Sequence, residues 1–288
     1  MHQSKNQNKI MKVELKKVDA EKGIVQITTT DERWYQIGEI FLPSVTWICS
    51  FYPKGKRFWK WVADMGWDEA EALKQEAADK GSKVHAACSD ALQGKEVKID
   101  AKYVNNSMGQ EEELTPVEYG CVMSFVDFLN EYQPEILGFD YTLTNQEFGY
   151  AGTVDFKCRL NSDNYEHVWI VDIKTSKDVW PSMELQVSAY KHADKGVTKI
   201  AILQVGYERN KNKKFKLTEI DDKFELFLSA RSIWQEEVGG ISPLQKDYPM
   251  SVMWSKKRPV AKAVPVKVET PQGKPKKVVR RKLVKKKA

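Results

Sequence analysis

Cysteine and histidine are scarce in this chain, with four of each among 288 residues. The spacing of Cys49, Cys88, Cys121 and Cys158 fits neither a zinc site nor a disulfide framework. This excludes cysteine-rich metal modules and small secreted folds held by disulfides. It favours a reducing compartment, and we expect a cytoplasmic protein of a bacterial or phage-infected cell.

Long apolar runs are also missing. No stretch of roughly 18 apolar residues occurs, so no segment is expected to span a bilayer. Residues 1–10 are polar, so we expect neither a secretory signal nor a membrane anchor there. No Gly-x-x-x-x-Gly-Lys-Ser/Thr loop is found, so a fused P-loop motor is not expected. The 41% hydrophobic content still allows one large or two modest domains.

Acidic residues are almost absent from the end of the chain. Residues 255–288 contain 14 Lys and Arg and one acid, a net charge of +13. Because the whole chain carries +6, the remaining residues carry −7, the difference between the two. With four prolines and no helical periodicity, this basic tail is predicted to be disordered. Two interpretations stay open: it tethers nucleic acid through phosphate contacts, or it is a solvated terminus.

A predicted β-hairpin carries the residues with the clearest chemistry. Residues 150–159 and 167–174 are rich in β-branched and aromatic side chains, and the turn composition at 161–164 separates them. Alternation along a strand places Asp172 and Lys174 on one face. If Asp155 lies opposite Ile170, Asp172 is its diagonal neighbour at about 7–8 Å between Cα atoms, on the same face.

Two acids and a lysine at one point are suited to phosphodiester hydrolysis. Oxygen ligands favour Mg²⁺ or Mn²⁺, which polarises the phosphate and lowers the pKa of a bound water. Lys174 then stabilises developing charge or orients the water. The alternative is a plain hairpin with exposed Asp and Lys side chains. A register slip of one residue would send the acids to opposite faces and remove the site.

Two predicted helices complete this group. One begins near Pro181 and places Gln186 and Tyr190 on an apolar face, where a buried amide needs a hydrogen-bonding partner. The other spans about residues 68–92 and carries His85 among small residues. His85 is either a metal ligand or a buried, hydrogen-bonded histidine. The glutamine is either part of the site or one satisfied core residue.

In this order the motifs resemble the PD-(D/E)xK nuclease superfamily, specifically its RecB-like branch. The resemblance covers roughly residues 40–205. It rests on Gly152-Thr153-Val154-Asp155, Asp172-Ile173-Lys174, Gln186-x-x-x-Tyr190 and Gly81-Ser82-Lys83-Val84-His85. Residues 43–46, Trp61 and residues 66–78 are similar to the lead-in of phage-type and mitochondrial single-strand exonucleases of this branch.

The resemblance implies a role for each matching position. Asp155, Asp172, the Ile173 carbonyl and His85 would hold the metal, and Lys174 would be the catalytic lysine. Gln186 and Tyr190 would support the site and contact DNA. Glu147 is a further candidate, with a strand-edge acid as the alternative. Some relatives carry an iron–sulfur cluster on three cysteines after the Gln-Tyr helix. Here all four cysteines precede it, so no cluster is expected.

The resemblance and the residue patterns predict an α/β fold, a restriction-endonuclease-like core with a mixed sheet and helices on both sides. We expect an N-terminal β element at 1–42, a nuclease domain at 43–250 and the basic tail at 255–288. Strands are expected at 12–19, 23–29 and 34–41. Residues 94–113 are predicted to be irregular, and Thr115 and Glu118 predict a capping box.

The predicted function is metal-dependent cleavage of DNA, by an exonuclease in phage or bacterial recombination, repair or replication. DNA that is single-stranded or has free ends is the expected partner. Of nine tryptophans, most are expected in the core, and one or two near the site could stack on bases. The alternatives are a catalytically silent DNA-binding protein with the same fold, an endonuclease, and a hydrolase of small phosphoesters.

Overall fold

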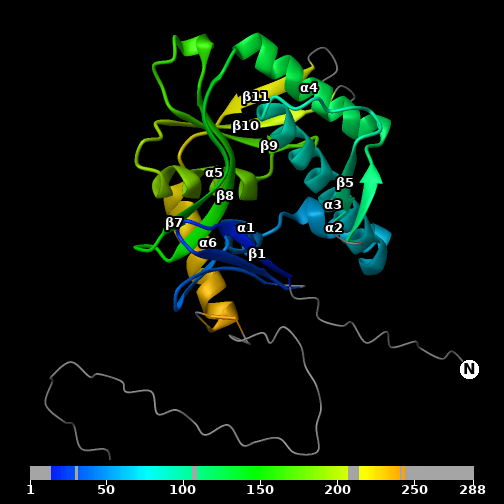
Figure 1. Ribbon diagram of the computed structural model, residues 1–288. Coiled ribbons are helices and arrows are strands. Elements are labelled where there is room, and N and C mark those ends of the chain that lie inside the picture. Colours follow the sequence, from blue (N-terminus) through cyan, green and yellow to red (C-terminus); the bar gives the residue numbers. More distant parts are fainter. Residues whose placement is uncertain (1–13, 30–31, 106–108, 207–213, 241, 244–288) are drawn as a thin grey trace, which may run out of the picture. The chain divides into compact units, whose positions relative to one another are not determined.

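The computed structural model describes residues 14–29, 32–105, 109–206, 214–240, 242 and 243. Within these ranges the chain has a mixed α/β architecture (Figure 1). A small antiparallel sheet comes first, and a sheet with helices on both faces follows. The basic tail lies outside the described residues. None of the described helices is long and apolar enough to cross a membrane.

The N-terminal sheet has four antiparallel strands, where three were predicted. They are β1 (Glu14–Asp19), β2 (Ile24–Thr28), β3 (Arg33–Ile37) and β4 (Ile40–Pro43), in that order. The predicted strand at 34–41 was wrong, because the chain reverses in its middle. Gly38 has a φ of +58°, which glycine adopts without the steric cost of a Cβ atom, so a two-residue turn forms there.

Three helices follow: α1 (Val45–Ser50), α2 (Lys56–Met65) and α3 (Trp67–Leu92). The Ser44 hydroxyl caps α1 by accepting a hydrogen bond from the Trp47 amide at 3.1 Å. Residues 94–113 are not wholly irregular, since β5 (Lys102–Asn105) and β6 (Gln110–Glu113) form a hairpin. Helix α4 (Pro116–Tyr132) then begins at the predicted capping box, with Thr115 and Glu118 bonded reciprocally.

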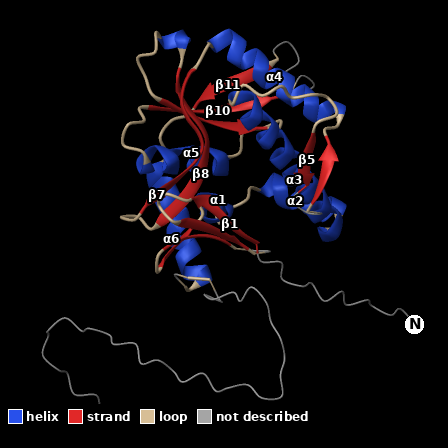
Figure 2. Cartoon of the chain, in the orientation of Figure 1, coloured by secondary structure: helices blue, strands red, loops and turns tan. Residues whose placement is uncertain are grey.

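The central sheet has five strands in the order β11-β10-β9-β8-β7 (Figure 2). They are β7 (Glu135–Asn145), β8 (Tyr150–Arg159), β9 (Trp169–Lys174), β10 (Lys199–Val205) and β11 (Phe215–Glu219). Helix α5 (Pro181–Ala193) connects β9 to β10, which are parallel, and the other pairs in this sheet are antiparallel. Helix α6 (Phe224–Val238) closes the described part.

The two faces of this sheet carry different side chains. One face packs against α3 and α4 through a core that includes Phe125, Phe128, Phe156, Val171 and Leu203. By alternation, Asp155, Asp172 and Lys174 belong to the opposite face, toward which α5 turns Gln186 and Tyr190. The predicted fold class, a mixed sheet flanked by helices behind a small N-terminal β element, is confirmed.

All four cysteines are buried thiols outside any disulfide. Three of them, Cys88, Cys121 and Cys158, belong to the core beneath α3 and α4. Burial raises the pKa of the Cys49 and Cys88 thiols and raises the pKa of Cys158 to about 12. These thiols therefore stay protonated and unreactive near neutral pH.

Candidate active site

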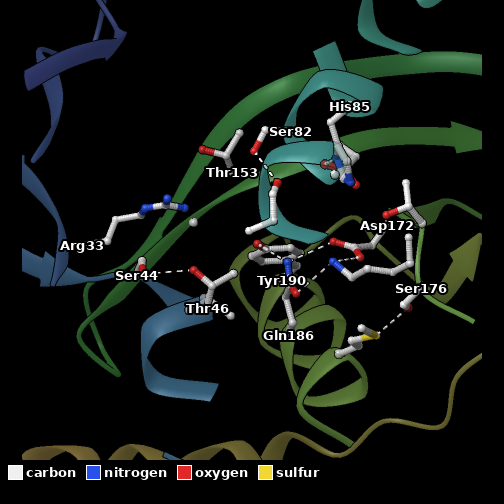
Figure 3. Close-up of a pocket in the computed structure, with 18 of the residues that line it drawn as sticks. Arg33, Ser44, Thr46, Ser82, His85, Thr153, Asp172, Ser176, Gln186 and Tyr190 are labelled. Atoms are coloured by element: carbon white, nitrogen blue, oxygen red, sulfur yellow. Dashed lines mark hydrogen bonds and ion pairs between the residues drawn. The ribbon is translucent and has the colours of Figure 1, made fainter. Parts of the chain in front are cut away.

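A pocket of about 940 Å³ opens where α3, α5, β8 and β9 meet (Figure 3). Its lining includes His85, Asp155, Asp172, Lys174, Gln186 and Tyr190. These six residues come from α3 and from the three neighbouring elements β8, β9 and α5, which lie much later in the sequence, and all six were predicted. The structure thus brings the predicted group together, although their chemical roles remain predictions.

Asp155 is held by one contact from a helix and one from the backbone of the next strand. Its Oδ1 lies 3.0 Å from Nδ1 of His85 on α3, and its Oδ2 accepts a hydrogen bond from the Ile173 amide at 2.6 Å. Ile173 therefore touches the site through its N–H group. The predicted role of its carbonyl as a metal ligand remains a prediction.

The hairpin register differs from the predicted one by two residues. Ile170 lies opposite Lys157, where Asp155 was expected. The turn is wider than expected, since a 3₁₀ turn at Asn161–Asp163 is followed by Asn164 and Tyr165, both with positive φ. A shift of two residues keeps every side chain on its predicted face, so Asp155 and Asp172 still converge.

Asp172 is buried, with its side chain 2% exposed. Its Oδ1 accepts a hydrogen bond from Gln186 Nε2 at 3.0 Å, and its Oδ2 lies 2.6 Å from the Lys174 ammonium. That contact pairs the buried carboxylate with an ammonium group, so a cation that bound Oδ2 would have to share or replace it.

Gln186 links the members of the group to one another. Its Nε2 donates both to Asp172 and to the Tyr190 hydroxyl at 2.9 Å, and its Oε1 accepts from Lys174 at 3.3 Å. The Gln186 amide, which is unusual on an apolar helix face, therefore has hydrogen-bonding partners for both its nitrogen and its oxygen. This position of Gln186 fixes the lysine and the buried acid relative to α5.

Burial and the neighbouring charges move the pKa values of the two acids in opposite directions. Burial raises the pKa of Asp172, which the charge of Asp155 raises further and Lys174 opposes. Burial also acts upward on Asp155, but His85, Lys174 and the Ile173 amide together bring the pKa of Asp155 below its usual value. A carboxylate that shares a site with a second acid raises the pKa of that acid, as Asp155 does for Asp172.

The neighbouring acids raise the pKa values of both bases in the group, Lys174 and His85. Burial acts to lower the pKa of Lys174 and of His85. For Lys174 the negative charges of Asp172 and Asp155 outweigh burial, and for His85 the charge of Asp155 does so, so both pKa values are raised. An ammonium group fixed beside two acids can stabilise charge that develops on a phosphate.

The donor chemistry fits a hard divalent cation, with two carboxylates and the Ile173 carbonyl available. Within the described ranges, however, no three His, Cys, Asp or Glu side chains form a ready metal-binding group. In the structure Asp155 engages His85, and Asp172 engages Lys174. A cation would have to compete with these two contacts.

Glu147 lies apart from the group. It is exposed in the turn between β7 and β8 and is not among the residues that line the pocket. Glu147 precedes Tyr150, the first residue of β8, so it lies outside the strand that carries Asp155. Among the predicted site side chains, Glu147 alone does not line the pocket.

No pattern in the sequence indicates that the N-terminal sheet contributes to this pocket. Arg33 and Tyr35 of β3 line it, and the Tyr35 hydroxyl lies 3.1 Å from Oγ1 of Thr153 on β8. Lys80 and Lys177 also line the pocket and add positive charge. Strand patterns indicate which face of a small sheet is apolar, but they do not indicate where that sheet docks.

No protein-family model matches the chain, and no curated protein matches it in sequence. Among solved structures, it is similar to the crystal structure of an alkaline exonuclease (LHK-Exo) from Laribacter hongkongensis. The sequence identity is 9% and the TM-score is 0.36, and the match covers 68% of this chain and 87% of that one. The similarity is distant.

Proposed function

We propose that this chain is a metal-dependent deoxyribonuclease that hydrolyses phosphodiester bonds. It acts as an exonuclease at free or single-stranded ends of DNA, in phage or bacterial recombination, repair or replication. The observation that carries the proposal is the half-buried Asp155 and the buried Asp172 with Lys174 beside them, all lining one open pocket. The basic tail at 255–288 belongs to the proposal as a tether for DNA.

Asp155, Asp172, the Ile173 carbonyl and His85 would hold Mg²⁺ or Mn²⁺. When bound, this cation supplies Lewis acidity toward the phosphate and lowers the pKa of a coordinated water. The two carboxylates that line one pocket and their oxygen-rich donor set support this assignment.

The side chains of the site have separable tasks. Lys174 remains protonated beside the two acids and stabilises the negative charge that grows on the phosphoryl oxygens. Gln186 holds Lys174 and Asp172 at a fixed separation, and the Tyr190 hydroxyl anchors Gln186. Arg33, Lys80 and Lys177 on the pocket wall attract the phosphate backbone of a strand.

A catalytically silent DNA-binding protein is the second candidate. In its favour, Asp155 pairs with His85 and Asp172 with Lys174, so the charges balance without a cation. The two candidates share the pocket and its positively charged wall. They differ only in whether a divalent cation displaces these pairs and bond cleavage follows.

The deciding experiment is DNA cleavage by the full chain with Mg²⁺ or with EDTA. Lys174→Ala should lower the cleavage rate by about 10²–10³-fold, because a preorganised cation at the reacting phosphate is lost. The matched control is Lys195→Ala, which removes an exposed lysine beyond α5 and should cleave like the wild type.

Linear and covalently closed circular DNA, each single- and double-stranded, separate the modes of action. Cleavage of linear DNA alone supports an exonuclease, and cleavage of circles indicates an endonuclease. Full Mg²⁺-dependent activity of Lys174→Ala would falsify the assignment of this lysine. DNA binding without cleavage in either metal would favour the silent binding protein.

A further inference from the structure

Helix α2 and the segment before it form a basic, aromatic surface that the proposed chemistry does not use. Residues 53–60 read Pro-Lys-Gly-Lys-Arg-Phe-Trp-Lys, which places four cations within seven residues, and the first acid is Asp64. Lys54, Lys56, Arg57 and Lys60 are all exposed, in a body whose net charge is negative. Cations interleaved with aromatic rings are typical of surfaces that bind nucleic acid.

The two faces of α2 are distinct. Phe58, Trp61, Val62 and Met65 recur at helical spacing and are half-buried, and α2 packs against α3. The other face carries Lys56, Trp59, Lys60 and Ala63, all exposed. The apolar face therefore already has a partner within the protein, and Trp59 points away from it.

Trp59 is an indole with no role in the core. Its side chain is 53% exposed, and Lys56 and Lys60 are its neighbours at positions i−3 and i+1. The Phe58 ring meets it edge to face at 5.3 Å between centroids, which limits how the indole can rotate. A large aromatic ring, oriented and flanked by ammonium groups, matches a nucleobase with its adjoining phosphates.

The lysines around this indole are available for phosphates. Lys60 pairs with Asp64 at 2.7 Å, but both side chains are largely exposed, so this ion pair is weak and exchangeable. Burial and then the charge of Lys74 on α3 lower the pKa of Lys54, which places two cations near one another. A polyanion at this position would relieve that repulsion.

The surface is connected to the active-site pocket through α3. Helix α2 lies beside α3 (Figure 1), and further along α3 the residues Ala77, Ala78, Lys80 and Gly81 line the pocket. A DNA strand that leaves the pocket along α3 therefore meets the outward face of α2.

We propose that Lys56, Trp59 and Lys60 form an auxiliary binding site for single-stranded DNA, with one unpaired base stacked on Trp59. The site takes an unpaired strand because the bases of a duplex stack on each other and cannot reach the indole. A lipid surface does not fit, since the apolar face of α2 is turned to α3. This inference rests on the proposed function, in that DNA enters the neighbouring pocket.

The test is equilibrium binding of a fluorescein-labelled oligothymidylate to the full chain in EDTA, where no metal-dependent cleavage occurs. Trp59→Ala should bind about tenfold more weakly, the usual cost of one lost stacking contact. The matched control is Trp67→Ala. Trp67 is 62% exposed but is followed by Asp68 and Glu69, so its removal should leave affinity unchanged.

Salt dependence separates stacking from charge. Replacing Lys56 and Lys60 with Ser should reduce the slope of log affinity against log salt by about 0.7 for each lost phosphate contact. Trp59→Ala should leave that slope unchanged while lowering affinity. Thermal melting by circular dichroism confirms that each variant folds, and α2 offers little risk because none of its residues is fully buried.

Each result has one meaning. Equal affinity of Trp59→Ala and the wild type for the oligothymidylate overturns the inference. A loss of affinity for duplex DNA as large as the loss for the oligothymidylate also overturns it. If Trp59→Ala loses binding to anionic lipid vesicles but keeps its DNA binding, the inference is overturned in favour of a membrane surface. Cleavage with Mg²⁺ is measured separately, so a failed nuclease assay with Trp59-dependent binding rejects the proposed function and retains the DNA-binding site.

Discussion

At the residue scale, the position of Tyr190 depends on residue 152 being a glycine, which has no side chain. A Cβ atom built on Gly152 would lie 2.5 Å from Cε1 of Tyr190, far inside van der Waals contact. The tyrosine ring can therefore lie against β8 only because residue 152 is glycine. Through Gln186, this close approach also determines where Asp172 and Lys174 are held.

Gly152→Ala should lower the free energy of unfolding by about 1–3 kcal/mol, because the buried ring has no space to move into. Urea denaturation followed by fluorescence measures this loss. Gly138→Ala on β7 is the control, since its Cβ would meet Tyr141 at an ordinary 3.5 Å. Equal stability of the two variants would mean that the ring shifts freely.

Much of the site was predictable at this scale, and the exceptions have physical causes. Alternation along β8 and β9 identified the shared face of Asp155, Asp172 and Lys174 even though the register was wrong by two residues. Glu147 was misplaced because the turn before Tyr150 takes it out of the sheet. Arg33 was missed because its place in the pocket comes from docking of the N-terminal sheet, which no local pattern records.

At the scale of elements, Asp194 connects the end of α5 to the central sheet. Its Oδ2 lies 2.7 Å from the Lys157 ammonium on β8 and accepts a hydrogen bond from Tyr141 of β7 at 3.2 Å. Burial acts to raise the pKa of Asp194, but the bonds from Lys157, the Gly196 amide and Tyr141 outweigh it, so the pKa is lowered.

A carboxylate whose pKa is lowered on folding stabilises the protein above its unfolded pKa, and the effect disappears as pH falls through the folded value. Asp194→Asn should therefore reduce stability by about 1 kcal/mol at neutral pH, allowing for solvent screening, and by progressively less in acid. Chemical denaturation at several pH values measures this difference. Glu76→Gln, an exposed change on α3, should show no such trend.

The element boundaries were predicted well where side chains mark them. Pro181 begins α5, and the reciprocal bonds of Thr115 and Glu118 begin α4. The hairpin of β5 and β6 was missed because its sequence is polar on both faces, so alternation gives no signal. The turn at Gly38 was missed because apolar residues continue on both sides of it.

At the scale of the described molecule, three tryptophans join the N-terminal sheet to the rest. Trp234 of α6 packs edge to face on Trp34 of β3 and on Trp47 of α1, at 5.8 and 5.3 Å between centroids. The small sheet and the last described helix thus share one aromatic cluster, and the pocket residues on β3 depend on it.

Trp234→Ala should lower the free energy of unfolding by about 3–5 kcal/mol, because a large ring leaves a cavity at this junction. Calorimetry should still find one transition if the two sheets unfold together. Ile233→Ala is the matched control: Ile233 is 42% exposed, and its replacement should change stability by about 0.5 kcal/mol or less. A separate early transition in the tryptophan variant would mean that the N-terminal sheet is independent.

The four buried thiols have a practical consequence. Because each is buried, an alkylating reagent reaches one only when the surrounding structure opens. Cys49 lies in α1, beside the site, and the other three lie in the core beneath α3 and α4. Peptide mapping after brief alkylation would therefore compare the opening of these two regions in the unmodified protein, without an introduced label.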